Sequence, residues 1–327
     1  VCWIPAVHFL LHELIEFWLE YKEEKAVHPW EWVLLAVDIP LLNVQTPKAV
    51  EQLFAHLAGA LDEPDIPTKF RAGHAQRWFS FEVVSMEGYI QFLIRTEAKF
   101  RDLVEAAFYA QYPESQIVEV EDYVTKVPDA YPNDTHDMWG SDFVLAENEA
   151  YPIRMYREFE HSISKDTVLK DPMGTFLESF SRIGPGEQMW FQMVVKPVNS
   201  SWKEKAIEKI KEIIGDESGH SGHDGIASKV IGQVGDAPIK LLGMIGDQIF
   251  TPGEDAHGDT HKEKEGPPNK LQYLTPGQTK IVEAMEEKMM KLGFKTKMRG
   301  VYVARKEVFR PERGVNALIG AINQFNI

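Results

Sequence analysis

Between residues 32 and 123 the spacing of apolar side chains changes in a fixed order, and this order is the strongest constraint on the fold. Short extended runs occur at residues 32–40, 78–84, 89–95 and 117–120. Helical spacing separates them at residues 47–61 and 100–108. The order strand, helix, strand, strand, helix, strand is typical of the split βαβ, or ferredoxin-like, arrangement. We therefore expect a first ferredoxin-like domain at residues 32–125.

The second half of the chain shows a similar pattern. The segments TPKAVEQLFAHLAG and DPMGTFLESFSRIG align without gaps, and each leads to an aromatic-rich strand. We expect strands at 143–156, 188–196 and 294–305, and helices from 172 and from 311. Residues 126–141, rich in Pro, Asp and Asn, are interpreted as a linker. The prediction is an α+β protein of two ferredoxin-like units with antiparallel sheets, the second (142–327) lacking its last strand where the chain stops.

The second unit is interrupted by a long segment that departs from this pattern. Helical patterns at 202–213 and 276–292 flank residues 215–274, which are rich in Gly, His and Asp around an apolar stretch at 226–250. We interpret 215–274 as an insertion. Packing of the apolar stretch on the body is favoured over contact with lipid.

The first 31 residues form an apolar helix pattern that becomes charged near Tyr21. His8, His12, Glu13 and Glu16 interrupt it, so it falls short of the roughly 20 apolar residues of a membrane span. One interpretation is an amphipathic helix docked on the body or on a partner. The other is a truncated start beside a missing membrane anchor, since the chain begins with Val.

The charge balance and cysteine content limit the class of protein. The formal net charge of −15 argues against a surface that coats nucleic acid, so contact with DNA would require a local basic patch. The single cysteine, Cys2, excludes an internal disulfide framework and a multi-cysteine zinc site. A reducing, cytosolic environment is the simpler inference.

No motif for nucleotide hydrolysis occurs. The sequence contains no GxxxxGK[ST], and the glycine-rich piece GPGEQ at 184–188 has neither the lysine nor the hydroxyl that hold phosphate and Mg²⁺. Gly184 is instead predicted to provide a left-handed helix cap. We expect no enzyme activity in this chain, and we predict no catalytic and no cofactor-binding residues.

The sharpest chemical signal lies in the insertion, where metal-binding residue types gather. These are His220, His223, Asp224, His257, Asp259 and His261. They lie among glycines, without the rigid helix that carries HExxH, so a solvated loop is favoured and no metal ligand is predicted.

Charged residues elsewhere suggest surfaces rather than active sites. Two sets of cations could contact phosphate, although a solvated sheet face explains them more simply. They are Lys196, Lys203 and Lys205, and Lys295, Lys297, Arg299 and Arg305. The carboxylates Glu119, Glu121 and Asp122 indicate only an acidic strand edge, because no paired base or metal spacing accompanies them.

Several segments, taken in order, resemble an uncharacterised N-terminal module of type IV secretion ATPases, the conjugative DNA transfer class, of candidate-phyla bacteria. The segments are WVLLAVDIP, TPKAVEQLFAHLAG, FSFEVVSMEGYIQFLIRT, VEAAFYAQYPESQIVEVEDY, GPGEQMWFQMVVKP and ALIGAINQFN. In such proteins the module follows a membrane anchor and precedes a RecA-like motor that carries the Walker motifs.

The resemblance implies a non-catalytic accessory region at the inner face of the cell membrane that mediates assembly or engages substrate. Its expected partners are the ATPase motor domain, neighbouring subunits and secretion-system proteins, with possible membrane contact, and direct DNA binding is left open. We expect a homo-oligomer only in the full-length protein. The alternatives are a metal-dependent enzyme that uses the histidine-rich insertion and a peripheral membrane adaptor.

Overall fold

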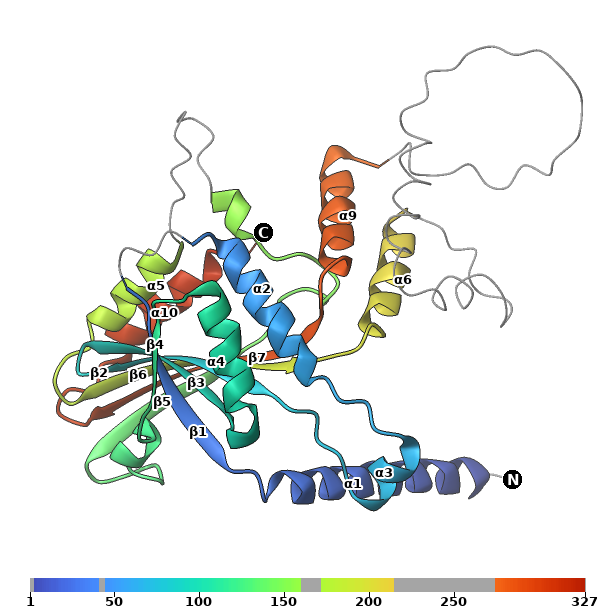
Figure 1. The fold of residues 1–327 in the computed structure, drawn as a ribbon, viewed down its shortest axis with the longest axis horizontal. Coiled ribbons are helices and arrows are strands. Elements are labelled where there is room, and N and C mark those ends of the chain that lie inside the picture. Colours follow the sequence, from blue (N-terminus) through green and yellow to red (C-terminus); the bar gives the residue numbers. More distant parts are fainter. Residues whose placement is uncertain (1–2, 41–44, 160–171, 215–273, 327) are drawn as a thin grey trace, which may run out of the picture. The chain divides into compact units, whose positions relative to one another are not determined.

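The computed structural model describes residues 3–40, 45–159, 172–214 and 274–326. This part of the chain is an α+β protein (Figure 1), as expected, and it divides into two compact units. The first contains the sheet and most of the helices, and the second contains α6 and α9 with residues 147–152.

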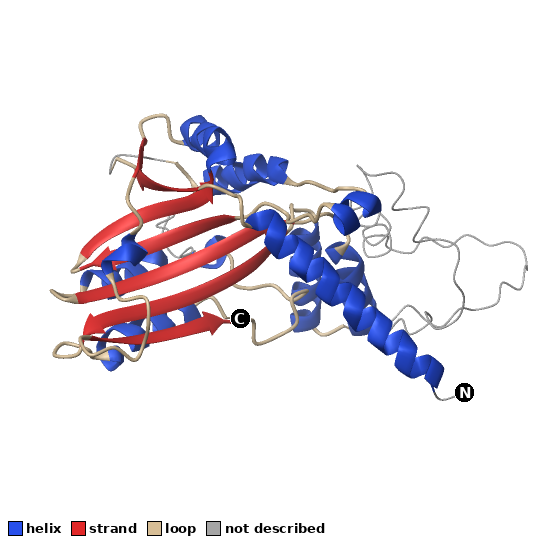
Figure 2. Ribbon diagram, turned by 90° about the horizontal axis from the view of Figure 1, so that it is seen from below, coloured by secondary structure: helices blue, strands red, loops and turns tan. Residues whose placement is uncertain are grey.

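The described strands form one antiparallel sheet (Figure 2). It has seven strands in the order β4-β1-β3-β2-β6-β7-β5. Their bounds are β1 (Trp32–Asp38), β2 (Phe79–Met86), β3 (Tyr89–Glu97), β4 (Gln116–Glu119), β5 (His136–Phe143), β6 (Glu187–Pro197) and β7 (Phe294–Arg305). The sequence predicted strands in two separate units. In the structure β2 pairs with β6 along eight residues, so both groups of strands belong to the same sheet.

Most of the described helices have a proline in their first turn. Their bounds are α1 (Trp3–Val27), α2 (Pro47–Leu57), α3 (Ile66–Arg71), α4 (Arg101–Gln111), α5 (Pro172–Ser181), α6 (Trp202–Ile214), α9 (Pro276–Met289) and α10 (Pro311–Asn323). The described residues also form the short 3-10 turns η1 (Ala58–Ala60), η2 (Ala98–Phe100), η3 (Tyr123–Lys126) and η4 (Tyr156–Phe159). Thr275 and Gln278 form a full capping box at α9, whereas the Thr46 side chain makes no capping hydrogen bond at α2.

Two helix pairs cover one face of the sheet. α2 packs beside α4, and α5 packs beside α10 (Figure 1). The first pair buries Leu57 and Val104 against Leu35 and Phe79, while the second buries Phe180 and Leu318 against Met189 and Tyr302. Gly300 in β7 allows close contact, because a Cβ there would lie 2.9 Å from the Leu318 side chain. Alternate strand residues thus fill two apolar cores on the same face.

The hairpin predicted around residues 85–88 is confirmed. Glu87 and Gly88 both have positive φ, 55° and 92°, as a tight type I′ hairpin turn requires. The Glu87 amide donates to the carbonyl of Glu187, and its carboxylate accepts from the Gly186 amide at 2.9 Å. This turn is therefore fixed to the start of β6.

Two expectations from the sequence are wrong. The strand predicted at 143–156 lies earlier, as β5, which pairs with β7 and occupies residues 136–141 of the expected linker. β5 is an edge strand with mostly polar, partly exposed residues, so its alternation is weak and only backbone pairing defines it. The left-handed residue of the turn before β6 is Gly186, with φ of 80°, and not Gly184.

The second unit is held by a small apolar core of its own. Ala206 and Ile210 of α6 pack with Met285 and Met289 of α9, and Ala150 joins them. The Lys288 ammonium donates hydrogen bonds to the carbonyl oxygens of Glu149 and Tyr151. Burial lowers the pKa of Lys288. The predicted insertion lies, apart from its last residue, outside the described residues.

Replacement of Leu57 with alanine tests the core beneath α2. Leu57 is fully buried, so we expect Leu57→Ala to lower the free energy of unfolding by about 2–5 kcal/mol, measured by urea denaturation. Val50 on the same helix is 42% exposed, and Val50→Ala should cost less than about 1 kcal/mol. Equal effects of the two variants would contradict this packing.

Candidate functional site: the open face of the sheet

The face of the sheet opposite the helices has two parts, which differ in how far they are covered by other segments of the chain. One part is covered by residues 120–131, which place Val120, Tyr123, Val127 and Tyr131 over Leu34, Val84, Trp190 and Val303. Another part carries side chains that are partly or fully exposed, at Lys196 of β6 and at Lys295, Lys297 and Arg299 of β7. We call the surface formed by these four residues the open face.

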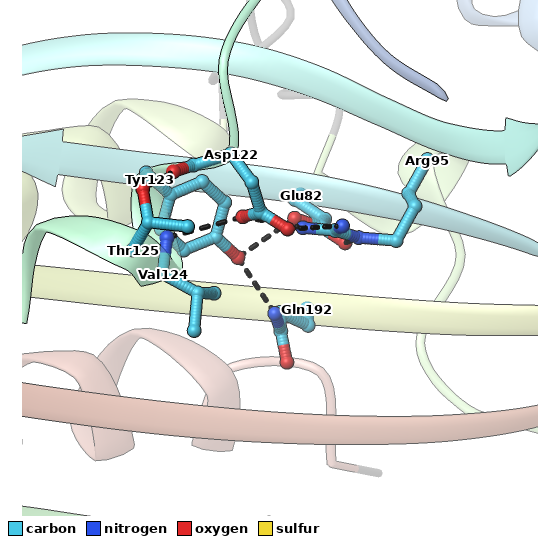
Figure 3. Close-up of polar contacts among 7 residues, drawn as sticks. All are labelled: Glu82, Arg95, Asp122, Tyr123, Val124, Thr125 and Gln192. Atoms are coloured by element: carbon cyan, nitrogen blue, oxygen red, sulfur yellow. Dashed lines mark hydrogen bonds and ion pairs between the residues drawn. The ribbon is translucent and has the colours of Figure 1, made fainter. Parts of the chain in front are cut away.

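A charged network fixes the covering segment to the sheet (Figure 3). Glu82 of β2 and Arg95 of β3 point from this face, and Arg95 Nε donates to Glu82 Oε1 at 3.2 Å. The guanidinium of Arg95 also donates two bonds to Asp122, at 2.6 and 3.0 Å. Such a bidentate pair defines both distance and orientation.

Tyr123 completes the network from above the sheet. Its hydroxyl donates to Glu82 Oε2 at 2.7 Å and accepts from the Gln192 amide at 2.6 Å (Figure 3). Its ring meets Trp190 edge to face, with 4.9 Å between centroids. Glu82 is only 2% exposed, so these bonds satisfy a carboxylate that would be very unfavourable if buried alone.

The pKa shifts follow from this geometry. Hydrogen bonds from Arg95 lower the pKa of Asp122, against the opposing effect of partial burial, and the Val124 amide adds to the lowering. Burial, with the charge of Glu82 beside it, raises the pKa of Tyr123 well above its usual range. For Arg95, burial acts to lower the pKa, but the bonds to Asp122 and the charge of Glu82 outweigh it and raise the value. The shifted groups all keep their ordinary charge at neutral pH, as expected of a structural network.

The sequence did not predict this network. Asp122 was placed in an acidic strand edge with Glu119 and Glu121, whereas Asp122 and Glu119 each pair with an arginine, Arg95 and Arg101 respectively. The available signal was Glu82, a charged residue within the apolar run WFSFEVV, which in a central strand requires a partner.

The open face carries a group of cations on two neighbouring strands. Lys295, Lys297 and Arg299 alternate along β7, and Lys196 of β6 is the direct partner of Lys295 in the ladder. Alternate strand residues share a face, so these four side chains point to the same side. Two of these cations have an acidic neighbour: a carboxylate oxygen of Asp142 lies 3.0 Å from Lys297 Nζ, and one of Glu23 lies 3.5 Å from Lys196 Nζ. The side chains of both ion pairs are at least one-third exposed, so these pairs contribute little free energy.

The other cations singled out in the sequence are placed elsewhere. Arg305 lies on the same face of β7 as Lys295, but at the far end of the strand, beside the turn at Gly186. Lys203 and Lys205 lie on α6 in the second unit. The structure thus groups Lys196 with the β7 residues and not with its neighbours in sequence.

Three tryptophans gather where β1 and β2 begin. The rings of Trp32 and Trp78 have centroids 4.2 Å apart, and Trp30 lies 5.7 Å from Trp32. The Arg77 guanidinium lies over Trp30 at 4.0 Å and its Nε lies 2.8 Å from Glu97 Oε2. Trp78 directly precedes Phe79, which pairs with Val195, the neighbour of Lys196. Aromatic rings therefore lie at the end of β2 nearest to the cations.

The glycine-rich turn at 184–188 does not resemble a phosphate-binding loop. Carboxylates already accept its amides: the Gly184 amide donates to Glu187 at 2.7 Å and the Gly186 amide to Glu87. Beside it is a cavity of about 230 Å³, whose charged lining residues include Glu87, Glu187, Lys126 and Arg305. Anionic groups that already occupy the amides would repel a phosphate.

The metal-ligating residue types of the described chain converge in one group, His12, Glu13 and Glu16 on α1, all exposed to solvent. His12 and Glu16 form a one-turn pair at 3.5 Å, which accounts for their proximity. The six histidines and aspartates noted at 220–261 lie outside the described residues. Among the helices that the structure describes, none combines the length and apolar character needed to cross a membrane.

The fold and this face define an α+β protein with one antiparallel sheet, helices on one side and a partly uncovered opposite side. The model of a family described as a domain of unknown function, DUF8128, matches residues 40–326, so the chain belongs to this family. No curated protein matches the chain, and no solved structure matches it.

Replacement of Tyr123 with phenylalanine tests the network. The variant leaves Glu82 and Gln192 without their shared hydroxyl, so we expect a loss of about 1–3 kcal/mol in the free energy of unfolding at pH 7. Faster proteolysis within residues 120–131 should accompany it. Tyr109→Phe, at a 40% exposed tyrosine, is the matched control, and an equal loss there would refute the assignment.

The pKa of Asp122 predicts a dependence on acid. Its folded pKa lies below the ordinary 3.8, so its stabilising effect is complete above that pH and is lost as pH falls through the folded value. The difference in unfolding free energy between the wild type and Asp122→Asn should therefore be largest near neutral pH and shrink below about pH 4. A difference that is constant across this range would show that the carboxylate charge is irrelevant.

Proposed function

We propose that the chain is a non-catalytic accessory region of a membrane-associated ATPase of the type IV secretion, conjugative DNA transfer class, and that its open face engages single-stranded DNA. The observation that carries the proposal is a local group of cations with adjoining tryptophans in a chain of net charge −15. A basic patch persists in an acidic protein most readily where it meets an anionic partner.

The spacing of the cations suits an extended strand. Residues two apart in a β-strand are about 6.8 Å apart, a separation comparable to that of successive phosphates in an extended single strand. Lys295, Lys297 and Arg299 repeat at this interval, and Lys196 widens the row by one strand. Tryptophan rings beside such a row are suited to stacking on unpaired bases.

The strand order supports an architecture of two ferredoxin-like units. The first four strands have the order β4-β1-β3-β2 with α2 and α4 on one face, which is the ferredoxin-like order. The strands β5, β7 and β6 repeat the order of β1, β3 and β2, with α5 and α10 in the positions of α2 and α4. The alignment of TPKAVEQLFAHLAG with DPMGTFLESFSRIG agrees with this repeat.

The ordered resemblance of six segments supports the cellular context. In that context the chain acts at the inner face of the cell membrane, and its other partners are the motor domain, neighbouring subunits and further secretion-system proteins. Its contribution is binding, because the charged network under residues 120–131 is occupied by internal bonds and offers no group for acid–base chemistry.

Binding of a fluorescein-labelled oligothymidine, measured by fluorescence anisotropy, tests the proposal. We expect the triple variant Lys295→Gln, Lys297→Gln and Arg299→Gln to raise Kd at least ~10-fold. Three phosphate contacts should also reduce the slope of log K against log salt by about 2. The matched control is a second triple variant on α6, Lys203→Gln, Lys205→Gln and Lys211→Gln. It loses the same amount of positive charge, and we expect it to bind the oligothymidine with the Kd of the wild type.

Two results would reject DNA engagement by this face. One is the absence of wild-type binding at low salt. The other is an equal loss in both triple variants, which would show attraction to net charge without a site. Circular dichroism of each variant establishes that the fold is retained.

A further inference from the structure

Helix α1 carries a continuous seam of apolar side chains at coiled-coil spacing. Alternate steps of four and three residues along the helix separate Trp3, Val7, Leu10, Leu14, Phe17 and Tyr21. An interval that averages 3.5 residues places all six on one narrow stripe, as positions a and d of three heptads. These side chains are between 42% and 70% exposed.

The contacts of α1 with the rest of its unit leave this seam uncovered. The Trp18 indole donates to the Phe70 carbonyl at 3.2 Å, and the Lys22 ammonium donates to the Arg71 carbonyl at 3.0 Å. Both residues lie to one side of the seam, where α3 packs. Phe17, in the seam itself, remains 70% exposed.

The charges beside the seam select a partner and an orientation. With Val7 and Leu14 at position a, Glu13 and Glu20 occupy position g and Lys25 occupies position e. In a parallel pair of identical helices, Glu20 of each copy lies beside Lys25 of the other, which gives two attractive pairs. In an antiparallel pair the g positions face one another, so Glu13 and Glu20 of the two copies would repel.

A membrane surface fits the helix less well than a second copy does. Glutamates surround the seam: Glu16 and Glu23 lie on the opposite side of α1, Glu13 and Glu20 lie at the edge of the seam, and Glu24 occupies the d position that follows Tyr21. Anionic lipid would repel this acidic helix, because helices that lie on membranes usually carry Lys and Arg beside the apolar side. The seam is also large enough for a dimer: at about 100 Å² for each of the six side chains, two copies would bury roughly 1,200 Å².

We propose that α1 joins two copies of this chain as a parallel, in-register, two-stranded coiled coil. The six seam residues form its interface, and Glu20 and Lys25 set its register. This inference is independent of DNA binding by the open face.

Sedimentation equilibrium of the full chain tests the pairing. The wild type should have twice the mass of the 37.3 kDa chain, and Phe17→Glu should raise the dimer Kd at least ~10-fold. Phe9→Glu is the matched control, because Phe9 is 62% exposed on the same helix but lies outside the seam. A monomeric wild type, or equal weakening by both variants, would overturn the proposal.

Disulfide trapping tests the orientation. With Cys2 replaced by serine, Leu14→Cys places two thiols face to face at an a position only in a parallel, in-register pair, so mild oxidation should give a covalent dimer. Glu16→Cys, which points away from the seam, should not cross-link. Failure of Leu14→Cys to cross-link would reject this register. A monomer that floats with phosphatidylglycerol vesicles only when Phe17 is present would instead assign the seam to lipid.

Discussion

The antiparallel pairing of β2 with β6 is the interaction on which the first unit depends. It joins four strands from the first part of the sequence to three from the second, and it places two helix pairs on the same face. Ser85 strengthens the junction by donating from β2 to the Phe180 carbonyl in α5 at 2.7 Å. Without this pairing, β2 and β6 would each expose an unpaired edge, which is a template for unwanted association.

The face of this sheet opposite the helices has two parts that differ in their cover. Near the centre, an apolar surface is covered by residues 120–131, which the pair Arg95–Asp122 and the hydroxyl of Tyr123 attach. Along the first half of β7 the exposed residues on this face are cationic, so water can solvate them without a covering segment. The same face therefore combines a closed structural region with an accessible charged one.

The charged network and the cation group were accessible to sequence reasoning to different degrees. Alternation along a single strand was sufficient to place Lys295, Lys297 and Arg299 on one side, and the structure confirms this. Lys196 could not be assigned to them, because its pairing with Lys295 joins residues almost one hundred positions apart. Likewise, no local pattern indicates that Tyr123 would meet Glu82 and Gln192, since the three residues lie on separate segments.

The sequence by itself determined most of the helices and most of the strands, because periodicity, first-turn prolines and turn residues act within a few neighbours. The short helix α3, which follows a proline-rich stretch, was not predicted. It failed for β5, whose polar residues carry little alternation and whose conformation depends on the backbone of β7. Only the tertiary structure decided that the strands form one sheet, which face residues 120–131 cover, and where the cations meet. These outcomes depend on contacts between distant segments, whose free energies depend on burial and partner geometry that a linear pattern does not contain.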